Sequence, residues 1–445
     1  MSKIPQHMLG IGAVMRGAGV LFVGTMATQV LTGLVYLFAA RGVLPAVYGT
    51  AATTASIALL AVAILDFGGS TFALRERSSG RMSSRSLSDW IRSKSAMIAV
   101  TAPFVGCIAA WSAGDLSWTT IAFSALLFVG ASLAMILGVP LRAQMRFGAI
   151  VTVTVASRLP SVGLILLLSF QGHADKVSLV ALLALSSFLE AWFYVAASRL
   201  SGHERHPYSS YRWTNPFRGG VGVGISSAAN SLGALDISLV RAVSGAAVAG
   251  EYAAVNRWMG PIGLTSQAVT QAVFPRMSAA EASGRGRGLA SALWTVSLSV
   301  PVVGAIALSA PWLVPTFLGD AYAGSVVTLQ LLCLAIVFSM ACQPLSAALV
   351  AWRLELHAAG CVLGGLTIQL AAQGMGAHLY GSRGAAGGAV VGQFMTVVLL
   401  CLVLRLTKAR WSKSRSSSEP TTILDVSGGA VVHHPLGEVP SAGPR

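Results

Sequence analysis

Residues 64–77, ILDFGGSTFALRER, mark the point where a long apolar segment becomes charged. The uncharged run 42–65 precedes Asp66, and the glycine pair 68–69 separates Asp66 from the charged triplet 75–77. About 20 residues without charge are enough to cross the hydrocarbon core of a bilayer as a helix. The stretch therefore predicts a membrane-spanning helix that ends at Asp66 and is followed by a basic loop.

Uncharged runs of this length recur along the whole chain. Only 10% of the 445 residues are charged, against roughly 25% in a soluble domain. A helix satisfies its backbone hydrogen bonds internally, which the interior of a bilayer requires. The sequence thus predicts an all-α polytopic membrane protein. Further runs without Asp, Glu, Lys or Arg occupy residues 17–40, 116–141, 288–319, 321–352 and 384–404.

About twelve spans are predicted, and the basic residues are distributed unevenly between their two sides. With the N-terminus inside, 24 of the 30 lysines and arginines fall in cytoplasmic segments, and only Arg41, Lys176 and Arg383 fall outside. This bias predicts that both termini are cytoplasmic. The net charge of +15 then indicates contact with anionic membrane lipids, not with nucleic acid. The predicted spans are residues 17–40, 47–73, 95–113, 117–139, 148–170, 177–199, 219–242, 251–274, 290–312, 322–350, 357–380 and 384–405.

The two halves of the chain begin alike. RGAGVLFVGTMATQV from Arg16 and RGGVGVGISSAANSL from Arg218 are separated by six predicted spans. Both copies therefore enter the membrane from the same side, which predicts two six-helix bundles related by a parallel pseudo-repeat. The predicted units are the bundles 1–200 and 219–406, a cytoplasmic linker 201–218 and a disordered cytoplasmic tail 407–445.

The sequence has no signature of a soluble enzyme. It has no P-loop and no H-E-x-x-H pair, and the G-x-G pairs within 220–224 lack the third glycine of a dinucleotide site. The five cysteines lie in apolar runs without a C-x-x-C pair, which argues against disulfides and metal ligation. We therefore expect no enzymatic activity, no cofactor and no metal.

Polar side chains inside the spans are the candidates for function, because they are costly within a membrane. Several form stripes at helical spacing on the first, seventh and eighth spans. The alternative is that such stripes serve only hydrogen bonding between helices. The predicted substrate-binding residues are Arg158, Arg241, Arg257, Gln29, Asn230, Gln267 and Gln271.

The spans contain three arginines but only two deep carboxylates, Glu190 and Asp236. This excess of positive charge predicts a cavity that favours an anion. Arginine stays charged and grips phosphate with paired hydrogen bonds. Arg241 and Arg257 lie near span ends, so the alternative for both is contact with lipid headgroups. Arg158 lies ~15 Å from the cytoplasmic end, which is too deep for that. Glu190 is expected to be its ion-pair partner, with a cation site as the alternative.

The glycine break after the second span suggests a moving part. Asp66 is expected to face Arg75 or Arg77 across the break and to form a hinge at a cytoplasmic gate. The alternative is a plain helix end at the membrane surface.

Two further patterns predict where helices pack. In SLSDWIRSKSAM, residues 86–97, one face carries Leu87, Trp90 and Ile91, which predicts a short interfacial helix anchored by the tryptophan. In the last span, glycines at spacing four allow close helix packing within the protein, a role we prefer to a dimer contact. These glycines are Gly384, Gly388 and Gly392.

Three stretches resemble the Wzx-type oligosaccharide flippases, the polysaccharide biosynthesis transporters of the multidrug/oligosaccharidyl-lipid/polysaccharide superfamily. The stretch 40–77 has the aromatic-glycine pair Tyr48-Gly49 and closes on Asp66-Phe67-Gly68. The stretch 235–260, followed by AVFPRM, carries Asp236, Gly250, Tyr252 and Arg257. GSRGAAGGAVVGQF, residues 381–394, is similar to the family's glycine- and alanine-rich start of a late helix.

The resemblance implies a MATE-like fold around a central cationic cavity, in the bacterial inner membrane. The implied function is to move an oligosaccharide carried on undecaprenyl diphosphate across that membrane for polysaccharide export, with a polymerase and other assembly proteins as partners. Lipid II flippases of the superfamily often have extra helices and an Arg-Asp pair in the first span, and neither feature is present here. One alternative is a cation-coupled multidrug exporter of the same fold. The other is a non-transporting membrane component of polysaccharide assembly.

Overall fold

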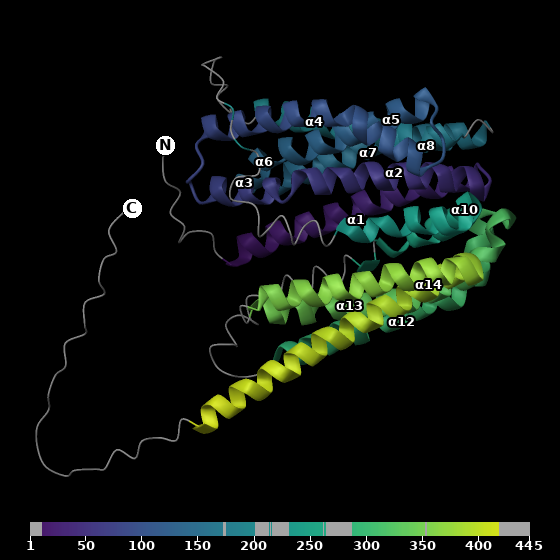
Figure 1. Cartoon of the computed structure of the whole chain (residues 1–445). Helices are drawn as coiled ribbons and strands as arrows, with labels where there is room; N and C mark the ends of the chain where they lie inside the picture. The colour runs from purple at the N-terminus through teal and green to yellow at the C-terminus, as the bar shows by residue number, and fades with distance from the viewer. Residues whose placement is uncertain are drawn as a thin grey trace, which may run out of the picture. The chain divides into compact units, whose positions relative to one another are not determined.

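The computed structural model describes residues 11–171, 175–200, 213, 215, 231–260, 262–263, 287–351 and 354–417. All secondary structure in these ranges is helical (Figure 1), as the sequence predicts. Ten of the described helices are long and apolar enough to span a membrane. The helices are α1 Ile11–Arg41, α2 Pro45–Asp66, α3 Gly69–Ser78, α4 Ser84–Ser112, α5 Trp118–Leu137, α6 Val139–Ala143, α7 Phe147–Phe170, α8 Lys176–Leu200, η2 Leu232–Ala234, α10 Leu235–Asn256, α12 Arg287–Leu318, η3 Asp320–Ser325, α13 Val326–Ala351 and α14 Glu355–Ser417.

Two of these helices turn back on themselves at a glycine. α10 is interrupted at Gly245 (φ 86°) and α14 at Gly381 (φ 61°), and both angles lie in the left-handed region that glycine tolerates. Both turns fall in the short loops that the sequence predicts between neighbouring spans. Each helix therefore consists of two arms, and the residues of the second arm run back toward the side from which the first arm came.

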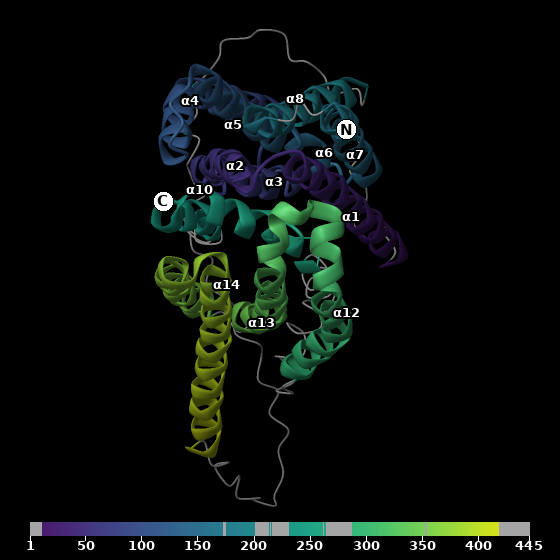
Figure 2. The same ribbon diagram turned by 90° about the vertical axis from the view of Figure 1, so that its right-hand side faces the viewer.

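The helices of the first half pack in a continuous series (Figure 2). α4 packs on α5, α5 on α8, α8 on α7 and α7 on α1. α2 contacts α4, α5 and α8, and it packs most extensively against α10 of the second half. In the second half α12 packs against α13. One apolar core, with Tyr48, Phe128 and Tyr252 among its largest buried side chains, extends through both halves.

The two arms of α14 pack through the glycines that the sequence singles out. A Cβ added at Gly384 would overlap the backbone of Gly376, and one at Gly388 would overlap the backbone of Gln373. A Cβ at Gly392 would overlap Gln369 in the same way. The prediction of a packing face inside the protein is thus confirmed.

At the predicted cytoplasmic end, the break after α2 is fixed by hydrogen bonds. Phe67 and Gly68 both have positive φ, and the Asp66 carboxylate accepts hydrogen bonds from the Ser70 backbone N–H (3.2 Å) and hydroxyl (2.8 Å) at the start of α3. The buried ammonium of Lys94 donates to the carbonyl oxygens of Leu65 (2.9 Å) and Asp66 (3.0 Å). This lysine satisfies carbonyls that the end of a helix otherwise leaves without partners.

The predicted pairing of Asp66 with Arg75 or Arg77 is therefore wrong. The short side chain of Asp66 is held by Ser70 one turn away, where it caps α3. Arg75 instead pairs with Glu76 at 3.4 Å and is 62% exposed. Arg77 donates to the Met82 carbonyl (3.0 Å) and the Ser84 hydroxyl (2.8 Å).

The predicted interfacial helix around Trp90 is also wrong. Residues 86–97 belong to the long helix α4, and Leu87 and Trp90 are 1% and 3% exposed. The amphipathic face packs into the core of the protein, because α2 lies where the pattern alone suggested lipid headgroups. The last part of the chain also differs from expectation. α14 continues to Ser417, past the predicted start of the tail at 407, and residues 418–445 lie outside the described ranges.

α2 and the second arm of α10 approach each other so closely that only glycine fits. A Cβ on Gly49 would overlap the Ala246 carbonyl oxygen, and a Cβ on Gly250 would overlap the Pro45 carbonyl oxygen. Gly250 lies 201 positions after Gly49, and Ala246 lies 201 positions after Pro45, so the two contacts are one contact repeated by the internal symmetry. Such self-complementary contacts arise where a two-fold axis passes between the partners. The pseudo-repeat axis thus runs between these helices.

Candidate functional site

Arg257 follows the last residue of α10 and reaches across to the first half of the chain. Its guanidinium donates to the Ser56 hydroxyl on α2 (3.0 Å) and lies over the Tyr36 ring of α1, 4.5 Å from the centroid. Such a cation–π contact is favourable because the ring face carries negative charge. This arginine is held in place by α1 and α2, and its buried Nε–H has no acceptor in the described part of the chain.

Gln29, a predicted site residue on α1, belongs to the same region. Its side-chain oxygen is 3.7 Å from the position that a Cβ on Gly260 would occupy, and Gly260 lies three residues after Arg257. The first span therefore meets the eighth predicted span at Gly260. Gln29 and Arg257 thus lie in the same region of the structure.

Asp236 lies at the start of α10, within a buried polar network. Its carboxylate accepts hydrogen bonds from the Ile237 N–H (2.6 Å), the Tyr252 hydroxyl (3.1 Å) and the Asn256 amide (3.0 Å). The Gln373 amide of α14 donates to the Tyr252 hydroxyl (3.0 Å). The network joins both arms of α10 to α14. Because Asn256 immediately precedes Arg257, the carboxylate also lies close to the arginine in the chain's fold.

Arg158 and Glu190 form an ion pair between α7 and α8. Arg158 Nη2 is 2.8 Å from Glu190 Oε2, and Nη1 donates to the Ser186 hydroxyl at 2.6 Å. The two side chains are 18% and 12% exposed. The geometry agrees with the ion pair that the sequence predicts. As in Arg257, the Nε–H of Arg158 is buried and has no acceptor in the described part of the chain.

Arg241 lies apart from the other two arginines. It is four residues before the turn at Gly245, and it donates to the Thr50 hydroxyl (3.0 Å) and to the Ala113 carbonyl oxygen. Arg257 lies twelve residues beyond the turn, or ~18 Å along a helix. Arg241 thus ties α10 to α2 and to the loop after α4. The idea that all three arginines line one cavity is not supported by these positions.

Several predicted residues cannot be placed, and others of interest were not predicted. Asn230, Gln267 and Gln271 lie outside the described residues. Tyr36 and Ser56, which hold Arg257, were not among the predicted site residues, and neither were Tyr252 and Gln373. Ser56 lies 201 residues before Arg257 and is its counterpart in the structural repeat, whereas the similar stretches from Arg16 and Arg218 are offset by 202 and do not pair the two. Predicting any of the four required knowledge of which helix faces meet.

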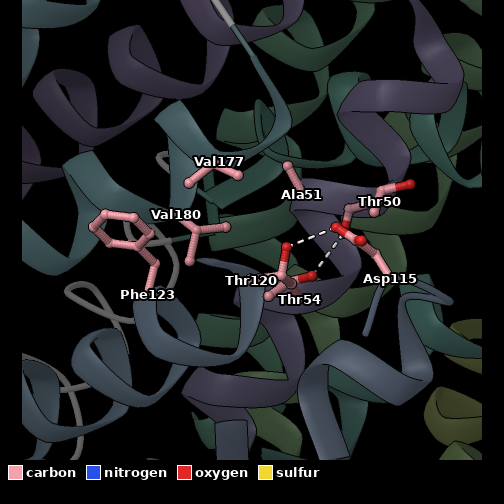
Figure 3. A pocket seen from close by; sticks show the side chains of 8 residues that line it. All are labelled: Thr50, Ala51, Thr54, Asp115, Thr120, Phe123, Val177 and Val180. Carbon is pink, nitrogen blue, oxygen red and sulfur yellow. Dashed lines mark hydrogen bonds between the residues drawn. The ribbon is translucent and has the colours of Figure 1, made fainter. Parts of the chain in front are cut away.

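A small cavity lies between α2, α5 and α8 (Figure 3). Asp115, one of its lining residues, accepts a hydrogen bond from the Thr120 hydroxyl (2.6 Å). The space inside is about 10 Å³, which is about the room that one water molecule needs, so the cavity is too small for a lipid-linked sugar. It is lined by residues of the first half alone: Thr50, Ala51, Thr54, Asp115, Thr120, Phe123, Val177 and Val180.

The fold is that of known membrane transporters. The chain is similar to an inward-facing multidrug resistance MATE family transporter of the MOP superfamily, with a TM-score of 0.67 and 16% identity over 87% of this chain and 96% of that one. It is similar to the lipid II flippase MurJ in an inward closed conformation, with a TM-score of 0.69 and 14% identity over 86% and 87%. A mutant of the Vibrio cholerae MATE transporter VcmN gives 0.61 and 12% over 90% and 96%.

The sequence itself defines the family more narrowly. Residues 14–281, more than half of the chain, match the family model described as polysaccharide biosynthesis protein. The chain therefore belongs to this family, which confirms the resemblance seen in its motifs. A search of curated proteins finds no match. The apolar helices and the family together define a multi-pass membrane protein.

Proposed function

We propose that this protein is a flippase that moves an oligosaccharide linked to undecaprenyl diphosphate from the cytoplasmic to the outer leaflet of the bacterial inner membrane. Family membership supports a role in polysaccharide assembly. The similarity of the fold to MATE transporters and to the lipid II flippase MurJ supports transport of a membrane-embedded substrate. The residues would act by binding and release, without a covalent step.

The observation that carries the proposal is the environment of Arg257. A buried N–H without an acceptor costs about 1–3 kcal/mol, so an unfilled donor in a native protein calls for an explanation. Among the residues that the structure describes, Arg257 and Arg158 each have one. A diphosphate offers several charged acceptors that match a guanidinium. Arg257, with Gln29 nearby, is therefore our primary candidate for the diphosphate contact, and Arg158 is the second.

The main alternative is a cation-coupled drug exporter, as the MATE relatives suggest. A cationic drug requires carboxylates that are free to bind it. Among the described residues, Glu190 is neutralised by Arg158, and Asp236 accepts three hydrogen bonds from its own fold. The described residues therefore provide fewer free groups for binding a cationic drug than for binding an anion. We therefore place the flippase first.

The orientation and partners follow from the same proposal. The basic loops, including Arg75–Ser84, would face the cytoplasm and meet anionic lipids there. Both termini would be cytoplasmic. A polymerase that consumes the lipid-linked repeat unit at the outer leaflet would be the functional partner, because the flipped product must be removed.

The proposal is tested in cells that make a surface polysaccharide and from which this protein has been removed. We expect radiolabelled lipid-linked repeat units to accumulate on the cytoplasmic side and to be exported again when the wild-type protein is supplied. Resistance to cationic dyes should not change. Loss of dye resistance with unchanged export would favour the drug exporter and contradict the flippase.

A further inference from the structure

The seam between α2 and the second arm of α10 is built from the same four positions of the internal repeat. On α2 these are Pro45, Gly49, Ala52 and Ser56, and on α10 they are Ala246, Gly250, Ala253 and Arg257. The spacings of four, three and four place each set on one helix face. Three of the four positions carry small side chains or proline in both copies. At the fourth position, the first copy has Ser56 and the second has Arg257, and the arginine donates a hydrogen bond to the serine.

The predicted outer half of this seam is closed. The backbones meet at Gly49 and Gly250, and Ala52 and Ala253 are fully buried. At the same end, the Tyr322 hydroxyl donates to the Val43 carbonyl oxygen (3.3 Å) and its ring packs edge-on against Tyr48. No polar path between the halves is open along these residues.

At the inner end of the seam, Arg257 joins the two halves among the residues that the structure describes. Its guanidinium, which belongs to the second half, rests on Ser56 and Tyr36, which belong to the first. Both partners are neutral. A phosphate carries negative charge and offers paired oxygens to the planar guanidinium, so it binds an arginine through two parallel hydrogen bonds, whereas a serine hydroxyl offers a single neutral acceptor. An anion at this position would therefore compete well for the donors that now hold the halves together.

We propose that Arg257 is a latch on this seam, which an anionic diphosphate opens by taking the guanidinium away from Ser56 and Tyr36. The identity of the anion rests on the proposed function, whereas the latch itself rests only on the contacts. A ligand shifts a conformational equilibrium only if it binds one state better, and here the anion binds the state in which Arg257 has left Ser56. The loaded carrier would thus open outward, and the empty carrier would close again.

Ala52 supplies a reporter, because it is fully buried on the seam. The Ala52→Cys substitution is made in a protein whose five natural cysteines have been replaced, and labelling by a hydrophilic thiol reagent is followed in detergent. We expect slow labelling in this parent. Ser56→Ala removes the acceptor of Arg257 and should speed labelling several-fold. The matched control is Ser186→Ala, which removes the acceptor of Arg158 at an equally buried serine away from the seam, and it should leave the rate unchanged.

The second arm of the experiment adds inorganic pyrophosphate as the anion. It should speed labelling of the Ala52→Cys parent, and it should have no effect once Arg257→Gln is introduced. If neither Ser56→Ala nor Arg257→Gln changes the rate in folded protein, the latch is wrong. Equal effects of pyrophosphate with and without Arg257→Gln would also overturn it. Faster labelling in Ser56→Ala and Arg257→Gln without any response to pyrophosphate would keep the latch and contradict the diphosphate of the proposed function.

Discussion

At the scale of single residues, the three arginines of the predicted cavity have three different surroundings. Arg257 contacts Ser56 and Tyr36 of the first half. Arg158 forms an ion pair with Glu190. Arg241, near the turn of α10, donates a hydrogen bond to Thr50. The sequence predicts that Arg158 is deep in the membrane and paired with Glu190. It does not separate Arg241 from Arg257, because both lie near the predicted loop and the pattern does not say which helices their side chains reach.

Substitutions of Arg257 should show how much its positive charge and how much its planar guanidinium contribute to transport. Lysine keeps the charge but loses the fork that binds two phosphate oxygens at once, so Arg257→Lys should keep more activity than Arg257→Gln. A charge-assisted contact is worth about 1.5–3 kcal/mol, so the glutamine variant should transport roughly 10- to 100-fold more slowly. The measurement is the initial rate of polysaccharide export at matched protein levels. Wild-type export by the glutamine variant would remove Arg257 from the site.

The Arg158–Glu190 pair should respond differently to single and double replacement. Removing one partner leaves the other charge buried, which costs roughly 3–5 kcal/mol in a well-buried pair, whereas an apolar replacement of both is often near neutral. We expect Arg158→Met to lower the thermal unfolding temperature more than the double variant Arg158→Met, Glu190→Met. Glu190→Gln should reduce export without abolishing it. A double variant less stable than the sum of the single changes would contradict a mainly structural pair.

At the scale of elements, the helices could be predicted from the sequence and several of their partners could not. The long apolar stretches locate α7 and α8 to within one residue at each end, although each helix carries a largely buried ionisable residue. The loops at Gly245 and Gly381 are predicted for the same reason. Trp90 and Lys94 were beyond prediction, since an amphipathic face packs equally well on lipid headgroups and on protein. Only the placement of α2 beside α4 decides between the two.

The packing of the α14 arms gives a test with a neighbouring control. A methyl group on Gly388 would overlap the backbone at Gln373, whereas one on Gly387 would meet nothing within 4 Å. Overpacking typically costs about 1–3 kcal/mol, while alanine in a helix is favoured over glycine by up to ~1 kcal/mol. Gly388→Ala should therefore lower the thermal unfolding temperature and Gly387→Ala should not. Equal thermal unfolding temperatures for the two variants would show that the two arms of α14 do not pack at Gly388 and Gln373.

At the scale of the whole molecule, the repeat links the sequence to a working cycle. The offset of 201 residues joins Gly49 to Gly250 and Ser56 to Arg257, so the axis between the halves passes through the seam that must open. The resemblance between the two halves of the sequence predicts this symmetry, and it does not say which residues meet at the axis. The division into a bundle 1–200 and a bundle 219–406 stays a prediction, since the described residues 11–401 form one compact unit by their contacts.

The energy source is also a property of the whole molecule. The sequence has no P-loop, so the flippase that we propose must draw on a gradient. A diphosphate carries about two negative charges, and moving one charge through 100 mV releases ~2.3 kcal/mol, so outward passage from a negative interior releases roughly 4–5 kcal/mol. The buried arginines neutralise part of this charge in the loaded carrier. The return of the empty, positive site toward a negative interior is then favoured by the same potential.

The most direct test of the account measures flipping in liposomes that contain the purified protein and a fluorescent polyprenyl-diphosphate sugar. A potassium diffusion potential is imposed with no proton or sodium gradient, and an impermeant quencher reports which leaflet holds the label. We predict that a potential negative on the starting side speeds flipping by the wild-type protein, and that Arg257→Gln removes most of this rate. The proposed role of the potential and of Arg257 would be contradicted if the flipping rate did not change with the potential, responded only to a proton or sodium gradient, and was the same in Arg257→Gln as in the wild type.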